Sequence, residues 1–146
     1  MFVHHTKLQK LIELLGKYIT QFWDDGRNVE DMGRVVNDFH RNRLCELLRD
    51  HRGHVVIGNP NAYQDHNLTP TVILSPARDS AVMRDEIFGP ILPVFPYTNL
   101  DEVIKVINEG EKPLAMYYFG SHGSANFKRL EKETTSGALV ANEVLF

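Results

Sequence analysis

The chain has 146 residues, of which 42% are hydrophobic and 24% are charged, and its formal net charge is −3 at pH 7. This length and composition are typical of one globular domain that buries a core without needing a metal ion or disulfides. Positive charges are interspersed with negative ones, which argues against a nucleic acid partner and a polybasic membrane patch, so we expect a small-molecule or protein partner.

Two amphipathic helices are predicted in the first fifty residues. The first is capped by Thr6 and ends near Asp24-Asp25-Gly26, because its apolar residues follow helical spacing. The second begins near Val35 and closes at Arg49, ahead of His51 and Gly53. The residues expected to face inward in the first helix are Leu8, Leu11, Leu15, Tyr18 and Phe22. Those expected to face inward in the second helix are Val35, Val36, Phe39, Leu44, Leu47 and Leu48.

The remaining elements alternate between strand and helix. Short apolar runs predict a buried strand at Val55–Ile57, a strand at Thr71–Leu74, and a third at Ile91–Phe95, where Pro93 favours an edge position or irregular pairing. Asn99 is expected to cap a helix that ends at Gly110. The later elements are a strand at Leu114–Phe119 covered on both faces, a helix at Ala125–Thr134 and a strand at Gly137–Val144, while Gly58–Asn67 is the expected mobile insertion.

Alternation of strands and helices in the last third predicts right-handed crossovers. The predicted fold class is therefore α/β, with a mostly parallel open sheet and flanking helices. No linker rich in Pro, Gly and Ser divides the chain, so residues 1–146 are expected to form a single α/β segment.

The segment Val82–Pro90 contains the candidate ligand-binding residues of the chain. An ionised carboxylate at the mouth of a parallel sheet can accept hydrogen bonds from both hydroxyls of a ribose, and Glu86 is the candidate. Phe88 could pack against a flat ring, and Gly89-Pro90 would turn the backbone into the next strand. The alternative is that Glu86 is a solvated turn residue and that Phe88 belongs to the core.

The single cysteine and the histidines suggest no further site. Cys45 excludes an intrachain disulfide and fits a reducing compartment. It stands beside Glu46 instead of an activating cation, so we interpret it as structural or exposed and not as a nucleophile. His51 and His54 have a spacing that could ligate a metal, but no acidic or cysteine cluster accompanies them, and no metal site is expected.

Nothing in the sequence predicts a membrane segment or a secretory signal. No apolar run approaches the ~20 residues that span a bilayer. The segment Met1-Phe2-Val3-His4-His5 lacks a basic region followed by an apolar stretch and a cleavage site. We therefore expect a cytoplasmic protein.

Residues 80–94 read Ser-x-Val-Met-x-x-Glu-Ile-Phe-Gly-Pro-Ile-Leu-Pro-Val. Further blocks are Gly33–Asn37 with His40 and Arg43, Pro70–Leu74, Lys112–Ala115 with Tyr117 and Phe119, and Glu133–Gly137 with Asn142. These blocks, in this order along the chain, resemble the class 3 type of NAD(P)-dependent aldehyde dehydrogenase.

The resemblance implies that Glu86 holds the nicotinamide ribose and that Phe88 borders the nicotinamide. It also implies that the chain is the C-terminal part of a catalytic domain that oxidises aldehydes to carboxylic acids. The nucleophilic cysteine, the general-base glutamate and the Rossmann-like cofactor domain are then absent, so no catalytic residue is expected here and NAD or NADP would bind only with the missing N-terminal part. We expect the isolated chain to be inactive.

The alternative hypothesis is a binding or interaction module that keeps the fold without the chemistry. Without the upstream half, sheet edges and an apolar cleft wall would be uncovered, and both hypotheses then predict self-association through those edges.

Overall fold

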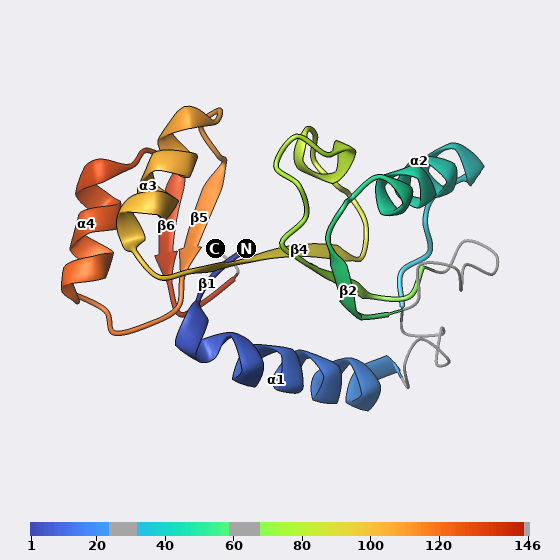
Figure 1. Cartoon of the computed structure of the whole chain (residues 1–146), viewed down its shortest axis with the longest axis horizontal. Helices are drawn as coiled ribbons and strands as arrows, with labels where there is room; N and C mark the ends of the chain where they lie inside the picture. Colours follow the sequence, from blue (N-terminus) through green and yellow to red (C-terminus); the bar gives the residue numbers. More distant parts are fainter. Residues whose placement is uncertain (24–31, 59–67, 145–146) are drawn as a thin grey trace. The chain divides into compact units, whose positions relative to one another are not determined.

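The computed structural model describes residues 1–23, 32–58 and 68–144, and the chain divides into two compact units, Met1–Pro96 and Tyr97–Phe146 (Figure 1). The first unit contains β1 (Phe2–His4), α1 (His5–Trp23), α2 (Asp38–Arg49), β2 (His54–Ile57), β3 (Thr71–Leu74), a short 3-10 helix η2 (Ala81–Met83) and β4 (Ile91–Tyr97), whose last residue begins the second unit. The second unit continues with α3 (Leu100–Glu109), β5 (Ala115–Tyr118), α4 (Ala125–Glu133) and β6 (Ala138–Ala141).

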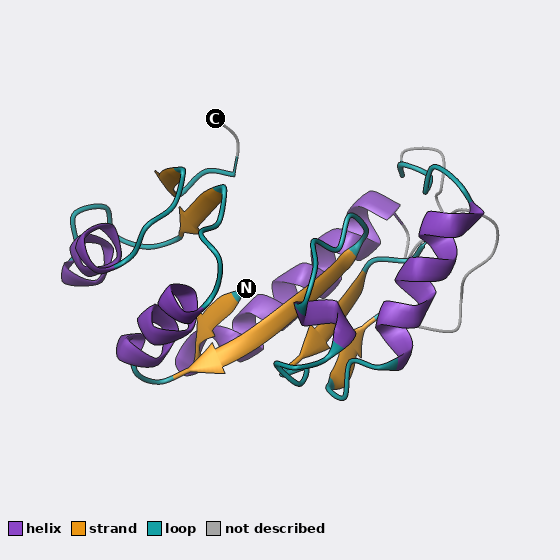
Figure 2. Ribbon diagram, turned by 90° about the horizontal axis from the view of Figure 1, so that it is seen from above, coloured by secondary structure: helices purple, strands orange, loops and turns teal. Residues whose placement is uncertain are grey.

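The first unit is built on a four-stranded sheet with the order β1-β4-β3-β2. Strands β3 and β4 are parallel, with Thr71 opposite Ile91, whereas β2 joins β3 antiparallel with an irregularity between Val55 and Ile57. Helices α1 and α2 flank opposite faces of this sheet (Figures 1 and 2). In the second unit β5 and β6 are parallel. The predicted α/β class with mainly parallel pairing is confirmed, although β4 lies in a different sheet from β5 and β6.

Of the two alternatives predicted from Pro93, the edge position is wrong, because β4 lies between β1 and β3, and the pairing of β4 with β3 is regular from Ile91 to Val94. Backbone nitrogens two residues apart in a strand point to the same side. Phe95 N–H donates to the Met1 carbonyl at 2.9 Å, so the nitrogen of Pro93 faces the side of β1 and not of β3. Proline can occupy this central strand because the pairing with β3 does not need its missing N–H.

Strand β2, which was predicted to be buried, lies at one edge of this sheet, and β1 lies at the other. The side chains of β2 alternate between exposed and half-buried, and Val56 is 36% exposed. A strand at the end of the sheet has one neighbour only, so a short apolar run there does not require burial on both faces.

The predicted inward face of α1 is confirmed at Leu8, Leu11 and Leu15, which are half-buried, but not at Tyr18 and Phe22. The helix begins at His5, so Thr6 lies inside its first turn instead of capping it, and the Thr6 hydroxyl hydrogen-bonds the His4 ring at 2.8 Å. Ile19 is the buried residue, whereas Tyr18 and Phe22 are about half exposed. A helix of this length with apolar residues on more than one side allows two neighbouring faces, and contact with the sheet selects the one through Ile19. The predicted end at Asp24-Asp25-Gly26 lies outside the described residues.

Helix α2 starts later than predicted, at Asp38, because the Asn37 side chain accepts a hydrogen bond from His40 N–H at 3.0 Å and caps it. Val36 and Phe39 are therefore exposed at its start. The three leucines of α2 join the core of the first unit. That core consists of Leu44, Leu47, Leu48, Leu68, Ile73, Val82 and Ile91.

In the second unit, helix α3 begins and ends at the predicted capping residues. Asn99 caps α3 by accepting from Asp101 N–H at 2.9 Å, and Gly110 follows its last turn. Arg129 links the two helices, bonding to Asp101 at 2.6 Å on α3 and to Glu133 at 2.7 Å on its own helix α4. The prediction that Leu114–Phe119 is covered on both faces is wrong for the described residues, since Leu114 is 82% exposed. An unbroken apolar run permits burial on both faces but does not require it, because a face is covered only where other elements pack on it.

No described helix has the length and apolar character to cross a membrane. Of the predicted insertion Gly58–Asn67, residues 59–67 lie outside the described part of the chain.

Candidate functional site

The segment Arg84–Pro90 forms a loop between η2 and β4. Val82, within η2, is 2% exposed and anchors the start of the loop in the core. At its other end, Ile91 N–H donates to the Gly89 carbonyl at 2.8 Å across Pro90, a bond between residues two apart that reverses the chain sharply. Thr71 N–H donates to the Pro90 carbonyl at 2.8 Å, which ties this turn to the start of β3.

Glu86 and Phe88 line the same open hollow, whose volume is about 440 Å³. The other residues around it are Met1, Val82, Met83, Asp85, Ile87 and Pro93. Phe88 is 79% exposed, and its backbone is in the left-handed region with φ of +46°. A left-handed conformation is uncommon for a bulky residue, and it is maintained only when the surroundings determine it.

The Glu86 carboxylate is exposed, and among the described residues no hydrogen bond or ion pair occupies it. An unoccupied carboxylate has two oxygens that can accept hydrogen bonds. Together with the exposed ring of Phe88, the hollow thus presents an acceptor group and a flat apolar surface two residues apart.

Two consecutive residues of helix α2, Arg43 and Leu44, contact this loop. Arg43 donates from Nη2 to the Ile87 carbonyl at 2.5 Å and from Nη1 to the Glu86 carbonyl at 3.4 Å. Leu44, fully buried, packs against Gly89 so closely that a Cβ atom at position 89 would lie 2.6 Å from its Cδ2. Leu44 was predicted to face inward, but the contacts of Arg43 and Leu44 with this loop were not predictable, because their partners lie more than forty residues away along the chain and no local pattern links them.

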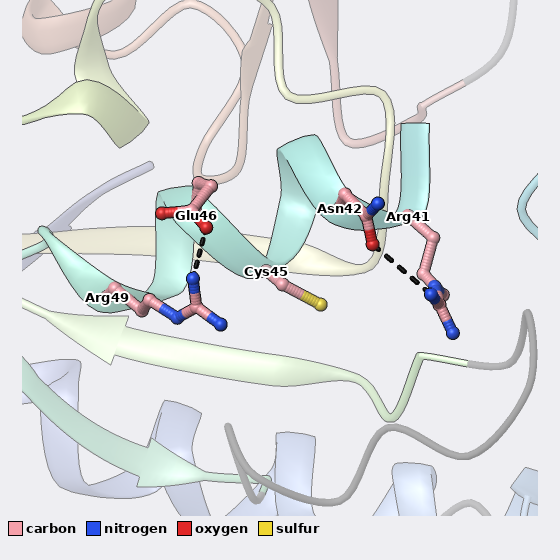
Figure 3. Close-up of a pocket in the computed structure, with 5 residues that line it drawn as sticks. All are labelled: Arg41, Asn42, Cys45, Glu46 and Arg49. Carbon is pink, nitrogen blue, oxygen red and sulfur yellow. Dashed lines mark hydrogen bonds and ion pairs between the residues drawn. The ribbon is translucent and has the colours of Figure 1, made fainter. Parts of the chain in front are cut away.

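A second hollow, of about 370 Å³, lies along α2 and contains the single cysteine (Figure 3). The Cys45 sulfur points to the same side of the helix as the guanidinium groups of Arg41 and Arg49. The prediction for Cys45 rested on the adjacent Glu46 alone, because Arg41 and Arg49 are four residues away and reach the same side only through the turn of the helix. Arg49 is paired with Glu46, Arg41 contacts Asn42 at 3.2 Å, and Cys45 packs partly against the core.

Within residues 1–23, 32–58 and 68–144 there is no group of three or more His, Cys, Asp or Glu side chains placed to hold a metal ion. The His51 ring accepts a hydrogen bond from Gly53 N–H at 2.9 Å. Burial lowers the pKa of His51, opposed in part by the adjacent Asp50.

The model of the aldehyde dehydrogenase family matches residues 1–145. The chain belongs to the aldehyde dehydrogenase family. Human aldehyde dehydrogenase family 3 member B1 is 39% identical over 136 residues, which cover 92% of this chain and 28% of the relative. The dimeric NADP-preferring aldehyde dehydrogenase of the mouse is 35% identical over 137 residues, covering 93% of this chain and 30% of the relative. The resemblance to the class 3 type is confirmed.

Solved structures of the family share the fold. The substrate-bound state of AldH from Staphylococcus aureus superimposes with a TM-score of 0.82 at 33% identity, over 99% of this chain and 31% of that one. The chain spans about 30% of the length of the human and mouse relatives.

Proposed function

We propose that this chain forms part of an NAD(P)-dependent aldehyde dehydrogenase and supplies the contact to the nicotinamide end of the dinucleotide. Glu86 binds the hydroxyls of the nicotinamide ribose, and Phe88 borders the nicotinamide ring. The observation that supports this assignment is that both side chains line one hollow.

The residues present fit a nucleoside. Vicinal ribose hydroxyls are two donors on adjacent carbons, and a carboxylate has two acceptor oxygens at matching separation. An aromatic face next to that carboxylate gives a planar ring a surface to lie against without a specific hydrogen bond. The Glu86 carboxylate is free for this role among the described residues, and Phe88 is exposed.

A nicotinamide dinucleotide supplies the acceptor for the hydride that leaves an aldehyde as it is oxidised to an acid. The residues of this chain contribute binding and orientation: Glu86 fixes the ribose, and Phe88 limits where the attached ring can lie. We place the nucleophilic cysteine, the general base and the rest of the cofactor site outside these 146 residues, and Cys45 takes no part in the chemistry.

A second candidate is a non-catalytic binding or interaction module with the same fold. Leu114 and Phe119, at the two ends of β5, are 82% and 58% exposed, and apolar side chains beside a two-stranded sheet favour pairing with another chain. On either proposal the isolated chain self-associates through these edges. The single cysteine supports a reducing, cytoplasmic setting.

The test is the dissociation constant for NADH and NADPH in the complete enzyme that carries this chain, measured by nicotinamide fluorescence. Glu86→Gln keeps the shape but removes the charge, and we expect binding to weaken about tenfold because charge-assisted hydrogen bonds are lost. Asp85→Asn is the matched control, since Asp85 lines the same hollow with the same charge. Equal effects of the two substitutions, or no effect of Glu86→Gln, would contradict the proposal.

A further inference from the structure

Arg43 joins α2 to the loop that carries Glu86 and Phe88. Its guanidinium donates to the backbone carbonyl of Ile87 at 2.5 Å and to that of Glu86 at 3.4 Å. Both acceptors are main-chain oxygens. Glu86 belongs to the proposed contact pair, and Ile87 lies between Glu86 and Phe88 in the sequence. The bonds therefore act on the direction of the backbone and not on the Glu86 carboxylate itself.

The charge of Arg43 is directed to these carbonyls. Among the described residues no carboxylate pairs with Arg43, whereas its neighbours on the same helix, Arg41 and Arg49, each pair with an acidic side chain three residues away. A hydrogen bond from a cation to a neutral acceptor is stronger than a bond between neutral groups. The planar guanidinium can also address two oxygens at once from fixed directions.

The loop needs an external constraint at this point. The residue after Ile87 is Phe88, whose φ of +46° is unfavourable for a bulky side chain and persists only when the surroundings impose it. On the other side of Phe88, Gly89 is held against the buried Leu44. Arg43 and Leu44 thus fix the backbone immediately before and after Phe88.

We infer that Arg43 is a positioning residue for dinucleotide binding: by holding the carbonyls of Glu86 and Ile87, it directs the Glu86 carboxylate and the Phe88 ring into one hollow. This inference rests on the proposed function, because it assigns to Arg43 the orientation of the two groups proposed to contact the nicotinamide end. Arg43 itself bonds to the loop backbone and is not among the residues that line that hollow.

The first measurement is amide hydrogen exchange of the 146-residue chain. In Arg43→Gln we expect exchange over residues 84–90 to rise about tenfold, while β3 keeps its protection because Thr71–Leu74 lie in the core of the sheet. Arg49→Gln is the matched control, since it removes an exposed arginine from the same helix without touching the loop. A loop equally protected in Arg43→Gln and in the wild type would overturn the inference.

The second measurement is the dissociation constant for NADH in the complete enzyme, read by fluorescence. We expect Arg43→Gln to weaken binding roughly tenfold, close to the effect of Glu86→Gln, with a thermal midpoint like that of Arg49→Gln. If Glu86→Gln weakens binding and Arg43→Gln does not, the inference fails and the proposed function stands. If Glu86→Gln has no effect, the proposed function fails, and hydrogen exchange alone decides whether Arg43 holds the loop.

If Arg43→Gln does not fold, Arg43→Lys replaces it in both measurements. Lysine keeps the charge but cannot address two carbonyls with a planar fork. We expect exchange over residues 84–90 to be faster than in the wild type, and the affinity for NADH to lie between those of the wild type and of Glu86→Gln. A lysine variant indistinguishable from the wild type in both measurements would contradict the two-carbonyl contact.

Discussion

Leu44 and Gly89 lie in direct contact: a Cβ atom built on Gly89 would be 2.6 Å from Cδ2 and 2.7 Å from Cδ1 of Leu44. Leu44 is fully buried in the core of the first unit, so it has little room to move away. The glycine therefore allows the loop with Glu86 and Phe88 to approach α2 closely.

Gly89→Ala is expected to destabilise the chain by about 1–3 kcal/mol, because an added methyl group must displace core atoms. Chemical denaturation of the 146-residue chain measures the change. Gly33→Ala is the control, since nothing lies within 4 Å of a Cβ atom there. Equal stability of the two variants would show that the loop does not rest on Leu44.

The Arg129 cluster predicts a dependence of stability on pH. Hydrogen bonds from Arg129 lower the pKa of Asp101 and of Glu133 below their ordinary values of 3.8 and 4.5. A carboxyl whose pKa is lower in the folded state stabilises the fold above its unfolded pKa and loses that contribution as pH falls through the folded pKa. Arg129→Gln should therefore lower the thermal midpoint near neutral pH, and the difference should vanish as the pH falls below about 4.

The size of this effect is limited because all three side chains are at least one-third exposed. We expect a shift of a few degrees at most in low salt, and less in 1 M salt, where exposed ion pairs are screened. A midpoint difference that grows on acidification would contradict the assignment.

The isolated chain is expected to show no NAD(P)-dependent oxidation of aldehydes. Cys45 packs partly against the core on α2 and does not line the hollow of Glu86 and Phe88. A spectrophotometric assay for NADH formation over a panel of aliphatic and aromatic aldehydes tests this. Turnover by the pure chain that is abolished in Cys45→Ser would overturn the expectation.

Self-association of the isolated chain should depend on the apolar side chains beside β5. Phe119→Ser removes a ring that is 58% exposed, and we expect it to shift the chain toward monomer in sedimentation velocity. Phe39→Ser, which removes a 73% exposed ring from α2, is the control and should leave association unchanged. A wild-type chain that stays monomeric at all concentrations would rule out the proposed edge pairing.

Features set by local chemistry were predictable from the sequence. The α3 helix begins and ends where Asn99 and Gly110 indicated, because capping depends on neighbouring residues alone. The strand at Thr71–Leu74 was likewise identified within its observed bounds. That Glu86 and Phe88 share a hollow agrees with the expected geometry, while their binding role stays a prediction.

Features that depend on distant partners were not predictable. An edge position or irregular pairing was expected for Pro93 because its missing N–H was considered without knowledge of which neighbouring strand that nitrogen faces. Tyr18 was assigned to the inward face because helical spacing alone cannot choose between two adjacent faces. The contact of Arg43 with Ile87 joins residues 44 positions apart, and only the folded chain brings them together.

The central claim is that the Glu86 carboxylate binds the hydroxyls of the nicotinamide ribose. The most direct test compares, in the complete enzyme, the affinities of wild type and Glu86→Gln for NAD and for an analogue that lacks both hydroxyls of that ribose. The account predicts that Glu86→Gln weakens NAD binding about tenfold but does not weaken binding of the analogue, because the partner groups are already gone. An equal loss of affinity for both ligands would contradict the claim.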